Sequence, residues 1–168
     1  ILQQTRVDQG EKYYHAFIDK YPVVGKLARA HEEEVLRLWQ GLGYYNRCRN
    51  LMTTAKMIDQ TYQGHFPDDY ESILALNGIG EYTAAAIASF AFNLPHAVVD
   101  GNVVRVLSRV FGITANFFET KGKRTFQTFA QLQLDLKQPG KYNQALMDFG
   151  ATICKPQQPI CGECPFMQ

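Results

Sequence analysis

The sequence lacks the long apolar runs and the charge excess that would assign it to a class at once. It contains no run of about 18 apolar residues, so no membrane-spanning helix is predicted. No signal-peptide pattern is present, and the chain starts at Ile1 without an initiator methionine, which suggests a fragment. Its 17 basic and 16 acidic side chains leave a net charge of +1. Any nucleic-acid binding therefore has to rest on local features.

The sequence also lacks the alternating pattern of strands, internal repeats and low-complexity segments. Its apolar spacing is helical, and a hydrophobic content of 46% is enough for a packed core. We expect an all-α protein of one domain or two small lobes. The expected helices cover 32–42, 51–62, 67–76, 81–92, 101–111, 125–136 and 142–149. Gly64 is expected to end the second of them, and Pro139-Gly140 the sixth.

A short glycine turn is the most informative local feature. Gly78 and Gly80 lie in the stretch 76–84, at the start of an alanine-rich run. Neither has a Cβ, so the backbone can turn sharply and lie against another group. A Gly-x-Gly turn that opens a helix directs backbone N–H groups at one place, which suits a phosphate. Taken alone, the turn fits a plain connection between two core helices about equally well, because short glycine motifs are weak evidence.

Cysteine is scarce, and three of the four copies lie in the last fifteen residues. Cys154, Cys161 and Cys164 are separated by six and then two residues. Such crowding favours a metal site in an intracellular protein over a disulfide framework. Thiolates hold Fe–S clusters or zinc. A zinc site would need a further ligand such as His65 or His96, both far away in the sequence.

The glycine turn, the cysteines and Asp100 together resemble the endonuclease III superfamily of helix-hairpin-helix DNA glycosylases. The cysteine spacing is similar to the C-x6-C-x2-C-x5-C loop of that superfamily, which implies a [4Fe–4S] cluster. The fourth cysteine of the loop would lie two residues past Gln168. Cys48 lies on an expected helix and matches no ligand position, so we do not assign it to the cluster.

Within that superfamily the chain resembles the adenine-specific mismatch glycosylases, the MutY family, over its whole length. The segments Gln3-Gln4-Thr5 and Gly41-Leu42-Gly43-Tyr44-Tyr45 match signatures of those enzymes. Position 82 is tyrosine where the lyase enzymes carry lysine, and a phenol cannot form a Schiff base. The implied activity is hydrolysis of adenine from a mismatch with 8-oxoguanine or guanine. The implied partner is double-stranded DNA, bound by a monomer without a membrane.

The resemblance assigns roles residue by residue. A glycosylase flips its target base out of the duplex and fills the hole, and the family's wedge residues map onto Gln4 and Tyr44. Asp100 matches the carboxylate that faces the developing sugar cation, although a lone aspartate before a helix is usually only an N-cap. The other matched positions are Tyr82 and Asn102 in the catalytic site, and Gln3, Thr5, Leu42, Gly78, Gly80, Gln144 and Lys155 as contacts to DNA or the base.

Two expected elements lie outside the chain. The family's catalytic acid is a glutamate two positions before the residue that matches Ile1, and a C-terminal domain reads the oxidised guanine. We therefore expect a fragment that lacks both ends and is inactive by itself. Dispersed basic residues are expected to be mostly solvated surface, with some DNA grip: Arg47, Arg49, Arg105, Arg109, Lys121, Lys123, Arg124 and Lys155.

We expect two lobes with DNA between them. Residues 1–95 would form a helical lobe that carries the hairpin at about 76–83, and residues 96–168 would form the cluster lobe. The expected location is intracellular and DNA-associated, cytoplasmic if bacterial. Two alternatives stay open at this point: an endonuclease III-like bifunctional glycosylase/lyase, and a non-catalytic DNA-binding hairpin module.

Overall fold

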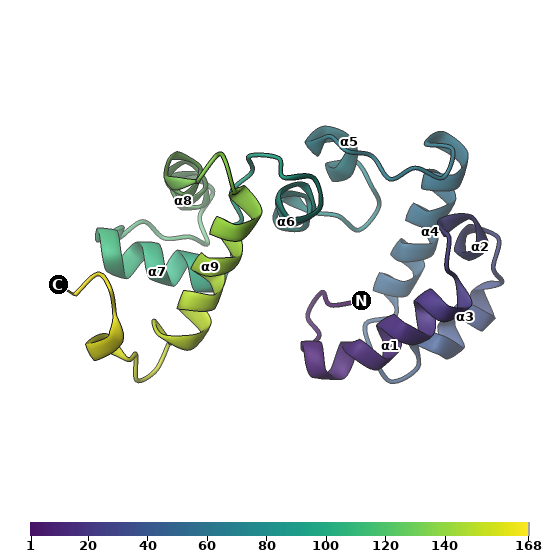
Figure 1. The fold of residues 1–168 in the computed structure, drawn as a ribbon, viewed down its shortest axis with the longest axis horizontal. Coiled ribbons are helices and arrows are strands. Elements are labelled where there is room, and N and C mark those ends of the chain that lie inside the picture. The colour runs from purple at the N-terminus through teal and green to yellow at the C-terminus, as the bar shows by residue number, and fades with distance from the viewer. Residues whose placement is uncertain (168) are drawn as a thin grey trace. The chain divides into compact units, whose positions relative to one another are not determined.

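The computed structural model describes residues 1–167, and over that range it contains helices and no strand. The α-helices and one 3-10 helix are α1 (Val7–Lys20), α2 (Val24–Ala28), α3 (Glu32–Trp39), α4 (Asn46–Thr61), α5 (Tyr70–Leu74), α6 (Glu81–Phe92), α7 (Gly101–Phe111), α8 (Thr120–Gln133), α9 (Pro139–Thr152) and η1 (Cys161–Glu163) (Figure 1). The predicted all-α class is confirmed. Within the described range, no helix has both the length and the apolar character needed to cross a membrane.

Several helix boundaries differ from the sequence prediction. The bounds of α6 and α7 agree with it, but α5 is only five residues long. Helix α8 begins at Thr120 rather than Thr125. Pro139 does not merely end a helix but lies in the first turn of α9, where the missing N–H of a proline costs nothing. Gly64, with φ of +81°, ends α4 as predicted, and its N–H donates to the Ile58 carbonyl.

The first compact unit comprises Ile1–Pro67 and Ala75–Ile79. Helix α4 is its central element and packs against α2 and α3, while α1 packs against α3. Val35, Trp39 and Cys48 are fully buried in its core. This unit therefore includes the N-terminal segment, the loop 41–45 and the first part of the glycine turn.

The second unit comprises Asp68–Leu74 and Gly80–Gln168. Helix α6 packs on α5 and α9, and α7 packs on α8 and α9. Val103, Leu107 and Phe126 form the centre of an apolar cluster between α7 and α8. This contact division places α6 with the C-terminal helices. The functional lobes expected from the sequence, 1–95 and 96–168, remain a prediction.

A buried asparagine fixes the segment that leads into α7. The Asn143 Oδ1 accepts a hydrogen bond from the Val98 N–H at 3.1 Å. Its Nδ2 donates to the Ser89 hydroxyl at 3.0 Å and to the His96 carbonyl at 2.9 Å. Because a buried amide has to be hydrogen-bonded, these contacts hold the extended chain just before Asp100 in one position.

Candidate active site and nucleic-acid interface

Asp100 is the N-cap of α7, and both of its carboxylate oxygens accept hydrogen bonds. Its Oδ1 accepts from the Val103 N–H at 2.8 Å, as the sequence predicted for a capping aspartate. Its Oδ2 accepts from Asn102 Nδ2 at 2.9 Å. The carboxylate is half-buried. It is thus held in a single orientation and still reaches the surface of the second unit.

Arg105 continues this hydrogen-bond network toward the cysteine loop. Its Nη2 donates to Asn102 Oδ1 at 2.7 Å and to the Gly150 carbonyl at 2.6 Å. Its Nε donates to the Cys154 carbonyl at 2.7 Å. The guanidinium therefore orients the Asn102 amide so that its NH₂ faces Asp100. It also binds one carbonyl in the last turn of α9, that of Gly150, and one just after this helix, that of Cys154.

Helices α7 and α9 cross closely at Gly150. A Cβ at this position would lie 2.7 Å from the Asn102 Cβ and 3.1 Å from the Asn102 carbonyl oxygen. These are a Cβ and a backbone atom, so neither can move aside without shifting a helix. The absence of a side chain at position 150 is therefore what lets Asn102 sit beside both Asp100 and Arg105.

Gly150→Ala should destabilise the protein because it overpacks this crossing. We expect a loss of about 1–3 kcal/mol in the free energy of unfolding, measured by chemical denaturation. Gly101→Ala is the matched control, since a Cβ there meets no atom within 4 Å and should change stability by less than about 0.5 kcal/mol. Equal stability of the two variants would contradict the tight crossing.

Tyr82 lies in the first turn of α6 and is 48% exposed. Partial burial raises the pKa of its phenol, and the negative charge of Asp100 raises it further. The hydroxyl is therefore protonated at neutral pH and available as a hydrogen-bond donor near that carboxylate. The structure brings Tyr82, Asp100 and Asn102 into one neighbourhood of the second unit.

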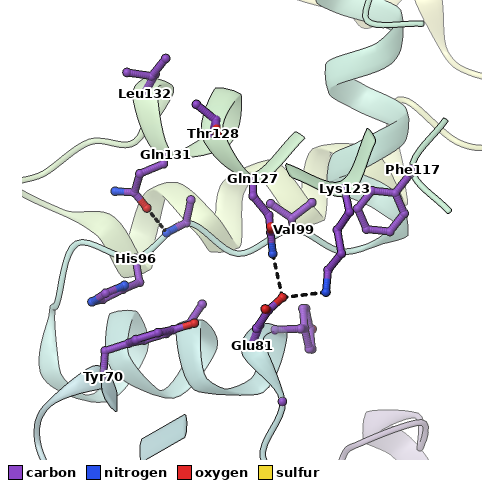
Figure 2. Close-up of a pocket in the computed structure, with 14 residues that line it drawn as sticks. Tyr70, Glu81, His96, Val99, Phe117, Lys123, Gln127, Thr128, Gln131 and Leu132 are labelled. Atoms are coloured by element: carbon purple, nitrogen blue, oxygen red, sulfur yellow. Dashed lines mark hydrogen bonds and ion pairs between the residues drawn. The ribbon is translucent and has the colours of Figure 1, made fainter. Parts of the chain in front are cut away.

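The start of α6 also borders a cavity of about 860 Å³ that faces α8 (Figure 2). Glu81 crosses it to pair with Lys123 Nζ at 2.7 Å and to accept from Gln127 Nε2 at 2.9 Å. These partners hold the pKa of the Glu81 carboxyl below its usual range. The contacts tie the first turn of α6 to α8 and so fix the backbone that carries Tyr82.

The two glycines of the turn differ in whether there is room for a side chain at their positions. Gly78 has φ of +78°, and a Cβ there would lie 2.7 Å from the Asn50 side chain. Asn50 Oδ1 in turn accepts from Asn77 Nδ2 at 3.0 Å, and the Gly78 carbonyl accepts from Gln3 Nε2 at 3.3 Å. Gly80 has no atom within 4 Å of its Cβ direction, so it leaves the N-terminus of α6 open to a ligand.

Both expected wedge residues have left-handed backbone conformations. Gln4 has φ of +53° and Tyr44 has φ of +47°, and both side chains are exposed. Leu42 differs from them, because it is only 6% exposed and packs in the core of the first unit. Its side chain supports the loop in this structure, and its predicted contact with DNA remains a prediction.

The three clustered cysteines differ in their surroundings. Cys154 is buried and its Sγ accepts from Arg109 Nη1 at 3.5 Å, whereas Cys161 is exposed and Cys164 half-buried. Arg109 also donates to the Lys155 carbonyl at 2.7 Å. Over residues 1–167, no three His, Cys, Asp or Glu side chains are gathered as a metal ion would need. The donor chemistry suits an Fe–S cluster, while the described geometry does not assemble its ligands.

Gln144, the expected base contact, lies on the exposed face of α9. Its Nε2 donates to Asp148 Oδ1 at 2.8 Å, one helical turn further on. Both side chains belong to the same unit as Asp100. The glutamine amide is thus held at the surface, where its oxygen could accept a hydrogen bond from a ligand.

Residues 1–133 match the model of the HhH-GPD superfamily base excision DNA repair protein. This chain belongs to that superfamily. The human adenine DNA glycosylase is 45% identical over 166 residues, which cover 98% of this chain and 30% of the human protein. The chain thus spans about a third of that relative's length.

Two solved structures of DNA-repair enzymes are similar to this chain. A thermostable thymine-DNA glycosylase superposes with a TM-score of 0.89 and 30% identity, covering 98% of this chain and 76% of that one. A non-covalent endonuclease III–DNA complex superposes with a TM-score of 0.78 and 25% identity, covering 93% of this chain and 72% of that one. The predicted resemblance to adenine-specific and endonuclease III-type glycosylases is confirmed.

Sequence reasoning missed the supporting residues of this HhH-GPD site. Arg105 and Arg109 were grouped with the solvated basic residues, but their guanidinium groups bind backbone carbonyls of the cysteine loop. The structural role of Asn143 was not predicted. The spacing of the two arginines could have indicated a shared role, because residues at i and i+4 lie on the same face of a helix, here α7.

Proposed function

We propose that this chain is part of an adenine DNA glycosylase that flips adenine out of a mismatch with 8-oxoguanine or guanine and hydrolyses its N-glycosidic bond. The observation that carries the proposal is the pairing of a fixed carboxylate, Asp100, with a phenol at position 82. The 45% identity to the human adenine enzyme supports adenine as the base.

The proposed roles of these residues follow from the charges that develop as the N-glycosidic bond breaks. Cleavage of the bond leaves positive charge on the sugar and negative charge on the departing purine. A fixed carboxylate stabilises the sugar cation most effectively when it needs no reorientation as charge develops. The two hydrogen bonds to Asp100 meet that requirement, since they hold the oxygens in place. Protonation of the purine needs a separate acid, and Asn102 and Tyr82 serve as polar neighbours of Asp100.

Double-stranded DNA is the proposed partner. One similar solved structure is a non-covalent complex of endonuclease III with DNA. In this chain, Gly78 and Gly80 present backbone N–H groups to a phosphate, and Gln4 and Tyr44 serve as wedges that fill the space left by the flipped base. Gln3 and Thr5 support the first wedge, Gln144 contacts the adenine edge, and Lys155 contacts a phosphate.

A [4Fe–4S] cluster is the proposed cofactor, with Cys154, Cys161 and Cys164 as ligands. Three thiolates on one short loop are the donors such a cluster takes. The Nη1 of Arg109 lies 3.5 Å from Cys154 Sγ, so a hydrogen-bond donor is already directed at the proposed ligand atom. When bound, the cluster would hold the loop that follows α9 in a fixed shape.

Cys161→Ser should lower the iron content of the complete protein, purified without oxygen, and weaken its absorbance near 400 nm, where thiolate-bound Fe–S clusters absorb broadly. Cys48→Ala is the matched control and should leave both unchanged. Cys48 is a core residue of the first unit whose burial raises the pKa of its thiol to about 11, whereas the three clustered cysteines belong to the second unit. Stoichiometric zinc without iron would contradict the cluster.

The proposed function is tested with the complete protein and duplexes that carry one adenine opposite 8-oxoguanine or guanine. We expect free adenine to be released and abasic sites to accumulate. Duplexes with thymine glycol serve as the comparison for the endonuclease III-like alternative. Release from thymine glycol but not from adenine mismatches would overturn the proposal, and binding without release of any base would favour a non-catalytic module.

A further inference from the structure

One arginine binds both of the exposed loops that carry the proposed wedges. Arg47 lies in the first turn of α4 and is half-buried. Its guanidinium makes five hydrogen bonds, all to the N-terminal segment 1–5 or to the loop 41–45. The sequence alone suggested only a solvated basic residue at this position.

The contacts divide between the two nitrogens of the guanidinium. Nη1 has three acceptors within hydrogen-bond distance, which share its two N–H groups: the Ile1 carbonyl at 2.9 Å, the Gln3 carbonyl, and Thr5 Oγ1 at 2.9 Å. Nη2 donates to the Leu42 carbonyl at 3.2 Å and to the Gly43 carbonyl at 3.4 Å. One nitrogen thus holds the segment on both sides of Gln4, and the other holds the two residues before Tyr44.

The same guanidinium also lies near two aromatic rings. It is 5.3 Å from the centre of the buried Trp39 ring and 5.6 Å from that of Tyr44. Trp39 Nε1 donates to the Gly43 carbonyl at 3.0 Å, so the tryptophan and the arginine hold the same peptide group. The exposed Tyr44 ring is thereby connected to the core through Arg47.

Both wedges need such support, because their backbone conformations are unfavourable for residues with a side chain. A φ near +50° costs about 1 kcal/mol or more outside glycine, and it persists only where surrounding contacts impose it. Gln4 and Tyr44 are both in this region, at +53° and +47°. Their loops share no helix or strand, so the Arg47 guanidinium is a physical link between them.

We propose that Arg47 is a positioning residue that holds the Gln4 and Tyr44 loops in one arrangement, so that both side chains enter the DNA duplex together. This inference rests on the proposed function. Lysine cannot replace the arginine, because a single ammonium has no planar fork with which to reach two loops in opposite directions. The proposal assigns Arg47 to base extrusion and not to the breaking of the glycosidic bond.

The test uses the complete protein with Asp100→Asn to suppress cleavage, and a duplex with 2-aminopurine beside the mismatched adenine. Extrusion of the adenine unstacks the fluorophore and raises its emission. We expect Arg47→Lys to reduce the rate of this rise by about tenfold or more, since small misplacements of positioning groups have effects of that size. Arg29→Lys is the matched control: Arg29 pairs with Asp59 at 3.1 Å in the same unit, and its replacement should change nothing.

Coupling to a wedge distinguishes positioning from general stability. Arg47→Lys and Tyr44→Ala should be non-additive in the extrusion rate, whereas Arg29→Lys and Tyr44→Ala should be additive. If Arg47→Lys fails to fold, Arg47→Gln decides the question, because its single planar amide is too short to bind both loops at once. A slower fluorescence rise in a folded Arg47→Gln variant would support the link, and an unchanged rise would overturn it.

The failure of this inference can be told from failure of the proposed function. If the protein with native Arg47 gives no fluorescence rise on adenine mismatches, the proposed function fails. If that rise occurs and a folded Arg47→Lys variant matches it in rate, only the role of Arg47 is overturned.

Discussion

Asp100→Asn should reduce the release of adenine from a mismatch by at least about a thousandfold while leaving binding to that DNA intact. The substitution removes the charge that we propose faces the developing sugar cation, and it keeps the shape of the side chain. Single-turnover excision and a DNA-binding titration on the same freshly purified protein measure the two effects. Fresh protein matters because the new amide can slowly hydrolyse back to aspartate.

The stability of Asp100→Asn separates capping from catalysis. An asparagine oxygen can still accept from the Val103 N–H, so the cap of α7 survives. Its NH₂ would however face the Asn102 NH₂, and Asn102 is held in that orientation by Arg105. We expect a loss of about 1 kcal/mol from this lost hydrogen bond.

Asp69→Asn is the matched control for Asp100. The Asp69 Oδ1 accepts from the Ser72 N–H at 2.8 Å at the start of α5, so it is also a capping aspartate. Its replacement should leave the excision rate unchanged. A near-normal rate in Asp100→Asn itself would show that Asp100 is only a helix cap.

The unmodified protein should leave uncut abasic DNA, and Tyr82→Lys should be the variant that gains covalent trapping by borohydride. A lyase needs an amine that forms an imine with the opened sugar, and Tyr82 provides a phenol instead. The side chain is half exposed at the beginning of α6, so replacement should preserve the fold. Strand scission before and after alkali, together with trapping on adenine-mismatch duplexes, measures the difference.

Tyr82→Ser is the control for the lysine variant, since it also removes the phenol but adds no amine. It should show no trapped complex. Efficient trapping by the unmodified protein would identify another lysine as a nucleophile and would contradict the reading of position 82. The absence of trapping in Tyr82→Lys would weaken that reading less, because an imine also requires a suitable pKa and placement of the amine.

Local patterns predicted the helices that carry the site better than they predicted the connections. Helix α6 and helix α7 have the expected bounds because the alanine-rich run and the capping Asp100 are local signals. Pro139 was ambiguous, since proline both ends one helix and suits the first turn of the next. Apolar spacing placed Leu42 on a helix that in fact ends at Trp39.

The supporting side chains could not be predicted, because their partners are distant in the sequence. Arg47 and Arg105 look like solvated cations in a linear reading, yet their acceptors are backbone carbonyls of other segments. Every peptide group offers such a carbonyl, so no residue type marks the place where an arginine will bind. The candidate residues were readable from the sequence, whereas the groups that hold them were not.

The contacts of Asp100 also bear on the order in which the site matures during synthesis. The carboxylate leaves the ribosome before Asn143, which holds the preceding segment, and before the Gly150 and Cys154 carbonyls, which hold Arg105. A nascent chain that stops short of α9 therefore contains Asp100 without the groups that hold its neighbours in place. Such a product would carry the proposed catalytic carboxylate in an unaligned form, so that formation of α9 is a required step in aligning it.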